Sequence, residues 1–447
     1  MDNAKFGMGF RILSVNIVQN IASKRYLTGF FAVCYANPSR NLGYGFAAQG
    51  VEDMSNLLIV HGGAPTAVMN ASLYGVIEEA RNSQKIDRVF GAIGGSEAVL
   101  AERFLDLLAY PESETRRLLR TPASSIGTSR FALEEHHYTR MAEILKEHDI
   151  RYVLMNGGNG TMDTCGRLDR VCRGLGISVI GVPKTIDNDI AVTDHAPGYA
   201  SAARFVAASV SEIACDVEAL PIHVSIMETM GRNAGWITAA AALARREAGD
   251  APHLIYLPAR GFRTDWFLED VERLYRRHGG VVVVCSEGLT GENGELLVPP
   301  VYTSGRSVYP SYVGMHLANL VIQELGIKAR YEKAGLCERT SIPWQSRVDR
   351  EEAVAVGRAA VRAALEGKSG LMIGIERISS DPYEIRLTEI PVDRVMMVER
   401  KIPDHWINAR GNDVTEEFLN WCRPLVGDDF GEYLQFTKLF AKRNEKE

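Results

Sequence analysis

Short apolar runs recur along the chain, and each is followed by a glycine-rich loop and then by a stretch with helical spacing. The runs are 57–60, 152–155, 178–182, 222–227 and 281–285. They carry few charged residues, as expected for strands of a parallel sheet that helices cover on both faces. The alternation therefore predicts an α/β fold built on doubly wound parallel sheets.

Residues 1–53 differ from the rest of the chain. They show neither helical nor strand periodicity, and they match no complete signal peptide with a cleavage site. The regular pattern begins at Met54. We expect 1–53 to be an N-terminal extension of unknown role, or the product of a start codon assigned too far upstream.

The last hundred residues contain one clear helix signal. Asp349 and Glu352 have the spacing of a capping box, Ala353–Leu365 is rich in alanine, and Gly367 has the place of a helix terminator. Residues 370–447 alternate polar and apolar positions and then become aromatic. We expect a closing segment there, with a sheet edge and a helical tail but no site.

The composition limits the class of protein. The 447 residues are 46% hydrophobic and 24% charged, with a net charge of −6, so the chain has globular composition and no basic field for nucleic acid or anionic lipid. No run approaches the ~18 apolar residues of a spanning helix. The seven cysteines include no C-x-x-C pair, which argues against a disulfide framework or zinc site and favours a cytoplasmic protein.

Four loops follow the predicted strands, where loop N–H groups and helix N-termini can bind anions. They span 62–70, 157–161, 183–189 and 230–235. The first lacks the G-K-[ST] ending of a P-loop, and no G-x-G-x-x-G follows a strand, which argues against an NAD-dependent dehydrogenase. The second has three glycines before a helix and suits a polyphosphate.

The loop 183–189 reads P-K-T-I-D-N-D. Asp and Asn are common in solvated turns, so an ordinary turn is one interpretation. The other is phosphoryl transfer, which needs a base for the acceptor hydroxyl, a cation on the transferring group and charge to organise a metal. Asp187, Lys184 and Asp189 would supply these three groups.

Together the loops resemble the phosphofructokinase family. The resemblance rests on G-G-x-G-[ST] at 157–161, P-K-T-I-D-N-D at 183–189, M-G-R-x-A-G at 230–235, Ser-Glu-Gly at 286–288 and Asn-Ala-Ser at 70–72, in the order and at the spacing of the family. It implies two Rossmann-like domains with the active site in the cleft between them. It also implies phosphoryl transfer to O1 of fructose 6-phosphate, with Mg²⁺, in a homodimer or homotetramer.

The resemblance divides the chain as well. Residues 54–197, completed by part of 340–370, correspond to the domain that binds the donor phosphate. Residues 198–339 correspond to the sugar-phosphate domain. The closing segment 370–447 follows them.

The resemblance also implies roles for individual residues. Asp187 is the general base, Asp189 helps to organise a metal or cation, Lys184 contacts the donor, and Arg130 bridges donor and acceptor phosphates. The donor phosphates lie on Gly63, Gly158, Gly160 and Thr161. The sugar phosphate contacts Thr185, Ile186, Asp187, Met230, Gly231, Arg232, Glu287, Arg330 and Arg339. Asn159 stands where the family usually has an Asp that supports Mg²⁺.

The markers for the donor and the acceptor disagree. Lys184 resembles the branch that uses pyrophosphate, but that branch usually has an Asp where this chain has Gly160. His223 and Leu336 replace an Arg and a polar residue that contact the sugar phosphate in many relatives. Three interpretations follow: a pyrophosphate-dependent 6-phosphofructokinase, an ATP-dependent kinase of the same fold, and a weakly active paralogue that binds sugar phosphates.

Overall fold

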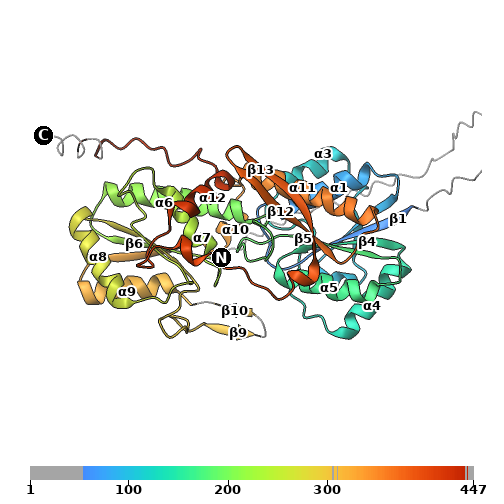
Figure 1. The fold of residues 1–447 in the computed structure, drawn as a ribbon, viewed down its shortest axis with the longest axis horizontal. Helices are drawn as coiled ribbons and strands as arrows, with labels where there is room; N and C mark the ends of the chain where they lie inside the picture. Colours follow the sequence, from blue (N-terminus) through green and yellow to red (C-terminus); the bar gives the residue numbers. More distant parts are fainter. Residues whose placement is uncertain (1–53, 305–306, 310, 438–439, 441–447) are drawn as a thin grey trace, which may run out of the picture. The chain divides into compact units, whose positions relative to one another are not determined.

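Two parallel β-sheets organise the chain in a computed structural model. The structure describes residues 54–304, 307–309, 311–437 and 440, so the prediction for 1–53 lies outside the described residues. All described residues belong to one unit, Glu52–Glu447. Figure 1 shows one sheet carrying the label β6 and the other carrying β1, β4, β5, β12 and β13.

The first sheet has the strand order β13-β12-β5-β4-β1-β2-β3. Its strands are β1 (Ser55–His61), β2 (Ile86–Ala92), β3 (Phe104–Asp106), β4 (Ile150–Gly157), β5 (Ser178–Pro183), β12 (Leu371–Ser380) and β13 (Tyr383–Pro391). The five central strands are parallel, whereas β3 and β13 are antiparallel edges. The predicted strands β1, β4 and β5 and the predicted C-terminal sheet edge are confirmed. The sequence pattern missed β2, where charged Asp87 and Arg88 interrupt the apolar run.

Helices cover both faces of this sheet because the side chains of β1 alternate. Leu57 and Ile59 pack with α1 (Met69–Arg81) and α11 (Arg347–Leu365). Leu58 and Val60 pack on the opposite face with α4 (Glu135–Glu147) and α5 (Asn159–Cys172). This two-sided burial is why the strands read as continuous apolar runs.

The strand order reverses between β1 and β4, which places a switch point at their carboxyl ends. Gly62 and Gly157 lie there. A Cβ atom added to Gly62 would lie 2.3 Å from Thr161 Oγ1, and one added to Gly157 would lie 2.1 Å from it. The two glycines therefore make room for the Thr161 side chain at the start of α5.

The second sheet is entirely parallel, with the order β11-β6-β8-β7. Its strands are β6 (Val224–Thr229), β7 (Leu254–Tyr256), β8 (Val281–Ser286) and β11 (Ala329–Lys333). One hydrophobic cluster joins it to α6 (Tyr199–Ala219), α7 (Trp236–Ala240) and α12 (Glu416–Val426), and another to α8 (Thr264–His278) and α9 (Val313–Leu325). The predicted strands at β6 and β8 are confirmed, as is the helical tail at α12.

The remaining elements are short. They are α2 (Ser96–Leu100), α3 (Glu112–Thr115), α10 (Leu336–Thr340), the hairpin β9 (Tyr302–Ser304) and β10 (Ser307–Tyr309), and 3₁₀ turns at Arg116–Arg120, Ala241–Ala244, Val392–Arg394 and Asp404–Trp406. Of these, α10 matters for the site, because it follows β11 at the carboxyl edge of the second sheet.

The predicted capping box of α11 is wrong. The helix begins at Arg347, and Ser346 is its N-cap, with Oγ accepting the Asp349 N–H at 3.3 Å. Asp349 instead accepts the N–H groups of Gly198 and Ser201 at 2.8 and 2.9 Å, so its buried carboxylate caps the start of α6. The predicted end is correct, since the helix stops at Leu365 and Gly367 has a φ of +77°.

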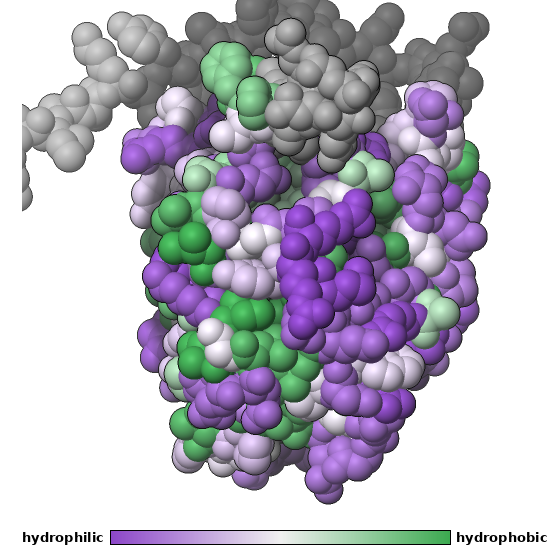
Figure 2. All heavy atoms as spheres, turned by 90° about the vertical axis from the view of Figure 1, so that its left-hand side faces the viewer, coloured by the Kyte–Doolittle hydropathy of each residue, from purple (hydrophilic) through white to green (hydrophobic). Residues whose placement is uncertain are grey.

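No helix in the described ranges is long and apolar enough to cross a bilayer. The six cysteines at described positions are all free thiols. The face in Figure 2 carries hydrophilic side chains over most of its described area, with smaller hydrophobic areas between them. This mixture is typical of a protein surface in contact with water.

Candidate active site

The segment 184–189 leaves β5 at the carboxyl edge of the first sheet. Its backbone is held locally: Lys184 N–H donates to Gly157 O at 3.0 Å, Asp187 N–H donates to Thr185 Oγ1 at 3.1 Å, and Asn188 Oδ1 accepts the Ala196 N–H at 3.1 Å. These contacts explain the residue types of the motif, because Thr185 and Asn188 are used to fold the loop. The two aspartates, each partly exposed, remain for chemistry.

Lys184 is almost completely buried, with 2% of its surface exposed. Its Nζ donates to the carbonyl oxygens of Gly62 at 3.0 Å and Ala64 at 2.5 Å. Burial lowers the pKa of Lys184 to about 7, although Asp187 acts in the opposite direction. The cation therefore lies at the loop Gly62–Ala64 after β1. We call this segment the donor loop, after its predicted role.

Asp187 lies within electrostatic range of charged residues that follow strands of both sheets. Burial, with the nearby carboxylates of Asp189 and Glu287, raises the pKa of Asp187 to about 7, while Arg232 and Lys184 oppose the rise. Lys184 and Asp189 come from the first sheet, and Arg232 and Glu287 follow β6 and β8 of the second. A carboxylate with a pKa near neutrality is suited to general base catalysis.

Asn159 and Asp189 are joined by hydrogen bonds. Asn159 Nδ2 donates to Asp189 Oδ2 at 2.9 Å and to the Asp189 carbonyl at 3.2 Å. Their two Oδ1 atoms are buried and have no hydrogen-bond partner among the described residues. No group of three or more His, Cys, Asp or Glu within the described ranges is arranged to hold a metal. The pair fits a divalent cation whose remaining ligands are substrate phosphates and water.

The donor loop is paired with the segment that precedes Arg130. Thr128 Oγ1 donates to Gly63 O at 2.7 Å, and the Gly63 N–H donates to Ser129 O at 3.3 Å. The N–H predicted to bind the donor phosphate is therefore already engaged in a long hydrogen bond. Arg130 follows at an exposed position and is close enough to Lys184 to lower its pKa.

The loop before α5 presents the end of a helix. Gly158 is the N-cap residue, so the first N–H groups of the helix point toward the switch point. Gly160 is exposed, and a Cβ added there would have no atom within 4 Å. Thr161 is 7% exposed and packs against Gly62 and Gly157, which leaves little of its side chain for a ligand.

Three segments that follow strands of the second sheet contact one another: the loop Met230–Arg232, α10 and the loop after β8. Both carboxylate oxygens of Glu338 accept the Met230 N–H, at 3.0 and 3.1 Å. Ser286 Oγ donates to Arg232 O at 3.0 Å, and a Cβ added to Gly288 would lie 2.1 Å from the same oxygen. The loop Met230–Arg232 is thus held between α10 and the loop after β8.

Sequence reasoning missed Glu338. It is 1% exposed, and burial together with Glu287 and Asp187 raises its pKa well above the ordinary value. The available signal was an acidic residue directly before Arg339. Arg339 itself belongs to the group, because it is close enough to Asp187 and Arg130 for both to act on its pKa, which burial lowers.

The structure does not bring Arg330 to this group. Arg330 pairs with Ser225 at the beginning of β6, whereas Met230 follows the end of that strand. At about 3.3 Å per residue the two ends are roughly 16 Å apart. His223 lies beside Arg330, is 1% exposed, and both its ring nitrogens lack a partner among the described residues.

Two further positions differ from expectation. Leu336 is 64% exposed, so it is not a core residue. The side chain of Ile186 is buried in the hydrophobic cluster around α6, which leaves little of it for contact with a sugar.

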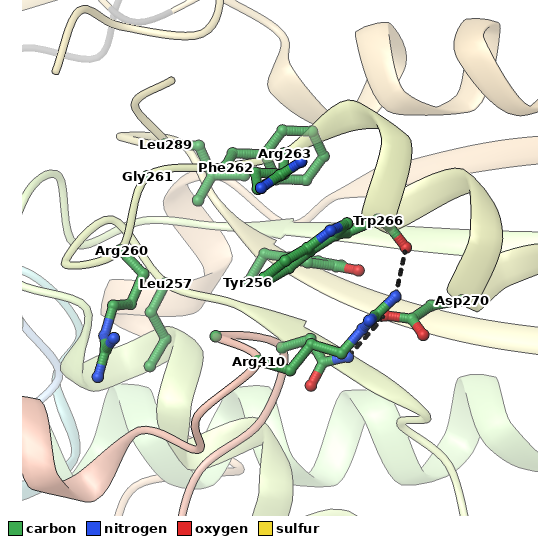
Figure 3. A pocket seen from close by; sticks show the side chains of 12 residues that line it. Tyr256, Leu257, Arg260, Gly261, Phe262, Arg263, Trp266, Asp270, Leu289 and Arg410 are labelled. Atoms are coloured by element: carbon green, nitrogen blue, oxygen red, sulfur yellow. Dashed lines mark hydrogen bonds and ion pairs between the residues drawn. The ribbon is translucent and has the colours of Figure 1, made fainter. Parts of the chain in front are cut away.

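Two pockets lie elsewhere. The first, at the end of β7, has a cavity of about 20 Å³, room for one water. Figure 3 shows Arg410 beside Asp270 there, where Nε and Oδ2 are 2.8 Å apart. The second, of about 330 Å³, is lined by residues of α6 and by 431–435. None of the described residues predicted for the active site lines either pocket, so neither is part of this site.

The chain is similar to known proteins over most of its length. The family model described as phosphofructokinase matches residues 56–364. The pyrophosphate–fructose 6-phosphate 1-phosphotransferase of Xanthomonas campestris is 38% identical over 83% of this chain and 91% of its own. A sulfofructose kinase from Alkalicoccus urumqiensis is 32% identical over 81% and 93%.

Solved structures agree. The crystal structure of a pyrophosphate-dependent phosphofructokinase from Marinobacter aquaeolei superposes with a TM-score of 0.77 at 34% identity, covering 86% of this chain and 94% of that one. The two doubly wound sheets and the order of the loops agree with these similarities. The chain belongs to the phosphofructokinase family.

Proposed function

We propose that this protein transfers a phosphoryl group from pyrophosphate to O1 of fructose 6-phosphate, yielding fructose 1,6-bisphosphate and orthophosphate. The observation that carries the proposal is the buried Lys184 ammonium, which donates to the carbonyl oxygens of Gly62 and Ala64. It acts on Asp187, whose pKa burial raises to about 7. The names of the relatives with 34–38% identity support the same donor and acceptor.

The two charged groups have separate tasks in this reaction. Asp187 takes the proton from the O1 hydroxyl as the bond from O1 to phosphorus forms. Lys184 and Arg130 stabilise the negative charge on the phosphate that leaves when the bridging bond of pyrophosphate breaks. Pyrophosphate has no nucleoside to bind, so a close cation carries more of the recognition.

The Oδ1 atoms of Asn159 and Asp189 would hold Mg²⁺ together with phosphate oxygens and water. When bound, the ion supplies charge neutralisation for the phosphates. Asn159 contributes a neutral carbonyl oxygen where a carboxylate would bind more strongly, so we expect weaker Mg²⁺ binding than a pair of aspartates would give. Asp189 contributes the only negative charge of the pair.

The sugar phosphate would lie on Met230, Gly231, Arg232, Glu287, Thr185 and Arg339. Arg330 and His223 lie at the other end of β6, so Arg330 can contact a 6-phosphate only from a second copy of the chain. A homodimer or homotetramer satisfies this geometry. We propose a cytoplasmic enzyme with no nucleic acid or membrane partner, consistent with the net charge of −6.

One assay tests the function. Purified full-length protein receives fructose 6-phosphate and Mg²⁺ with either pyrophosphate or ATP, and fructose 1,6-bisphosphate is measured. Turnover with pyrophosphate is the expected result. Turnover with ATP alone would show that the donor is ATP and not pyrophosphate. No turnover with either donor would favour a paralogue that binds sugar phosphates. Sulfofructose as a second acceptor tests whether the protein accepts a sugar other than fructose 6-phosphate.

A further inference from the structure

His61 is a buried polar residue at the centre of the donor site. It is the last residue of β1, its side chain is completely buried, and Gly62 and Gly63 follow it directly. Its Nδ1 lies 2.8 Å from Ser124 Oγ, and its Nε2 lies 3.4 Å from Asn156 Nδ2 at the end of β4. The ring therefore connects three segments across the switch point of the sheet.

The hydrogen bonds around the ring favour one position for the imidazole proton. The Ser124 hydroxyl has a single hydrogen and donates it to the Gly127 carbonyl at 2.8 Å. Ser124 Oγ is therefore an acceptor toward His61, and Nδ1 is the donor. On the other side, Asn156 Nδ2 also donates to Met69 O at 3.4 Å, so the amide nitrogen faces Nε2. Nε2 must then accept, and a proton there would meet the amide hydrogen.

Burial and the charge near the ring favour a neutral imidazole. Burial and the nearby Lys184 ammonium lower the pKa of His61 to about 3. The ring is thus neutral wherever an enzyme of this class works. A protonated ring would place a second buried cation beside Lys184.

The hydrogen bond of His61 Nδ1 is connected to Arg130, the predicted bridging arginine, through a turn of the chain. Ser124 Oγ fixes the carbonyl of Gly127, whose φ is +72°. The next two residues pair with Gly63 through the Thr128 hydroxyl at 2.7 Å and the Ser129 carbonyl at 3.3 Å. Arg130 is the following residue, so its position depends on this turn.

We infer that His61, as the neutral Nδ1–H tautomer, is a positioning residue of the donor site that holds the Ser124–Gly127 turn and through it Arg130. The role for Arg130 rests on the proposed function, whereas the tautomer and the turn do not. His61 touches no reacting atom in this scheme. Its effect should therefore be larger on use of the donor than on binding of the sugar phosphate.

Three variants of the full chain test the inference by kinetics with pyrophosphate. In H61N the amide nitrogen takes the place of Nδ1 and keeps the donor, so activity should stay near wild type. H61L and S124A lose the hydrogen bond and leave a buried partner unpaired. Their kcat/KM for pyrophosphate should fall about tenfold or more, with a smaller change in the KM for fructose 6-phosphate. S125A, a neighbouring exposed position, is the matched control and should keep wild-type rates.

A spectroscopic measurement tests the tautomer in the wild-type protein, and only the assignment of the signal uses a variant, H61N. In long-range ¹H–¹⁵N spectra of the wild-type protein labelled at histidine nitrogens, the His61 ring, assigned by its loss in H61N, should show a protonated Nδ1 and a bare Nε2 from acid to alkaline pH. A protonated Nε2, or a ring that titrates near 6.5, would overturn the inference. So would losses in H61L that are equal for donor and sugar phosphate, or that H61N does not rescue. Failure of wild-type turnover with pyrophosphate would reject the proposed function but leave this spectrum as a test.

Discussion

Lys184 and Gly62 are joined by a hydrogen bond of 3.0 Å from the ammonium group to the carbonyl oxygen. The bond ties the end of β5 to the end of β1 across β4, which lies between them in the sheet. Lys184 thus has a structural partner in addition to the charge that it would offer to a donor in the proposed function. Removing it should disturb the donor loop and the electrostatics together.

We expect K184M to lower kcat/KM for pyrophosphate by about 10²- to 10³-fold, the usual worth of one group that stabilises transition-state charge. Calorimetric binding of fructose 6-phosphate should be unchanged, because the contacts of Lys184 are to the donor loop. K146M, at an exposed position on α4, is the control. Equal losses of donor use and sugar-phosphate binding in K184M would contradict its assignment to the donor.

The pH profile of kcat/KM for fructose 6-phosphate should be bell-shaped around neutrality. Activity should rise as Asp187 loses its proton and fall as Lys184 loses its own, since burial brings both pKa values to about 7. The two groups interact, so the limbs report the pair. In K184R the alkaline limb should move to higher pH, because a guanidinium keeps its proton.

D187N should lower kcat by about 10²- to 10⁴-fold, the range for a positioned base, and should remove the acid limb of the profile. D393N, at an exposed aspartate, should leave both unchanged. If D187N kept the kcat of the wild-type protein, another group would have to be the base.

G288A should weaken binding of the sugar phosphate. An added Cβ would lie 2.1 Å from the carbonyl oxygen of Arg232, and a backbone atom cannot move aside cheaply. The loop Met230–Arg232 must then shift, so the KM for fructose 6-phosphate should rise while the KM for pyrophosphate stays constant. S113A, at an exposed position on α3, is the control and should leave both KM values unchanged. Unchanged kinetics in G288A would show that this close approach is not needed for binding.

The buried imidazole of His195 should make the protein less stable as the pH rises into the alkaline range. Its nitrogens lie 2.8 Å from Asp194 Oδ1 and 2.6 Å from Glu352 Oε2. Although burial lowers the pKa of His195, these two carboxylates raise it to about 9. The stabilisation is complete below the ordinary value of 6.5 and is lost as the pH rises through 9.

H195N should therefore cost about 3 kcal/mol of the free energy of unfolding at pH 6, and less above pH 9. Urea denaturation of both proteins at the two pH values measures this difference. H405N changes an exposed histidine and should show no such trend. A cost in H195N that does not vary with pH would mean that His195 is not ionised in the folded protein.

Local patterns were sufficient for the central strands and for the loops that follow them. Five of these strands are buried on both faces, and they therefore have continuous apolar sequences: β1, β4, β5, β6 and β8. The loop 183–189 was also readable, because Thr185 and Asn188 bond within the loop or with a segment a few residues away. Short or charged strands such as β2 and β11 were not readable, because their partners supply much of their burial.

The sequence by itself determined the family, the strand–loop order and the position of Asp187 and Lys184, since each depends on neighbouring residues. Only the tertiary structure decided that Glu338 supports Met230, that Asp349 caps α6, that His61 joins β1 to Ser124, and that Arg330 lies away from Asp187. The physical reason is sequence separation: these contacts join segments tens to more than a hundred residues apart. Their partners are chosen by the packing of the sheets, which local spacing does not encode.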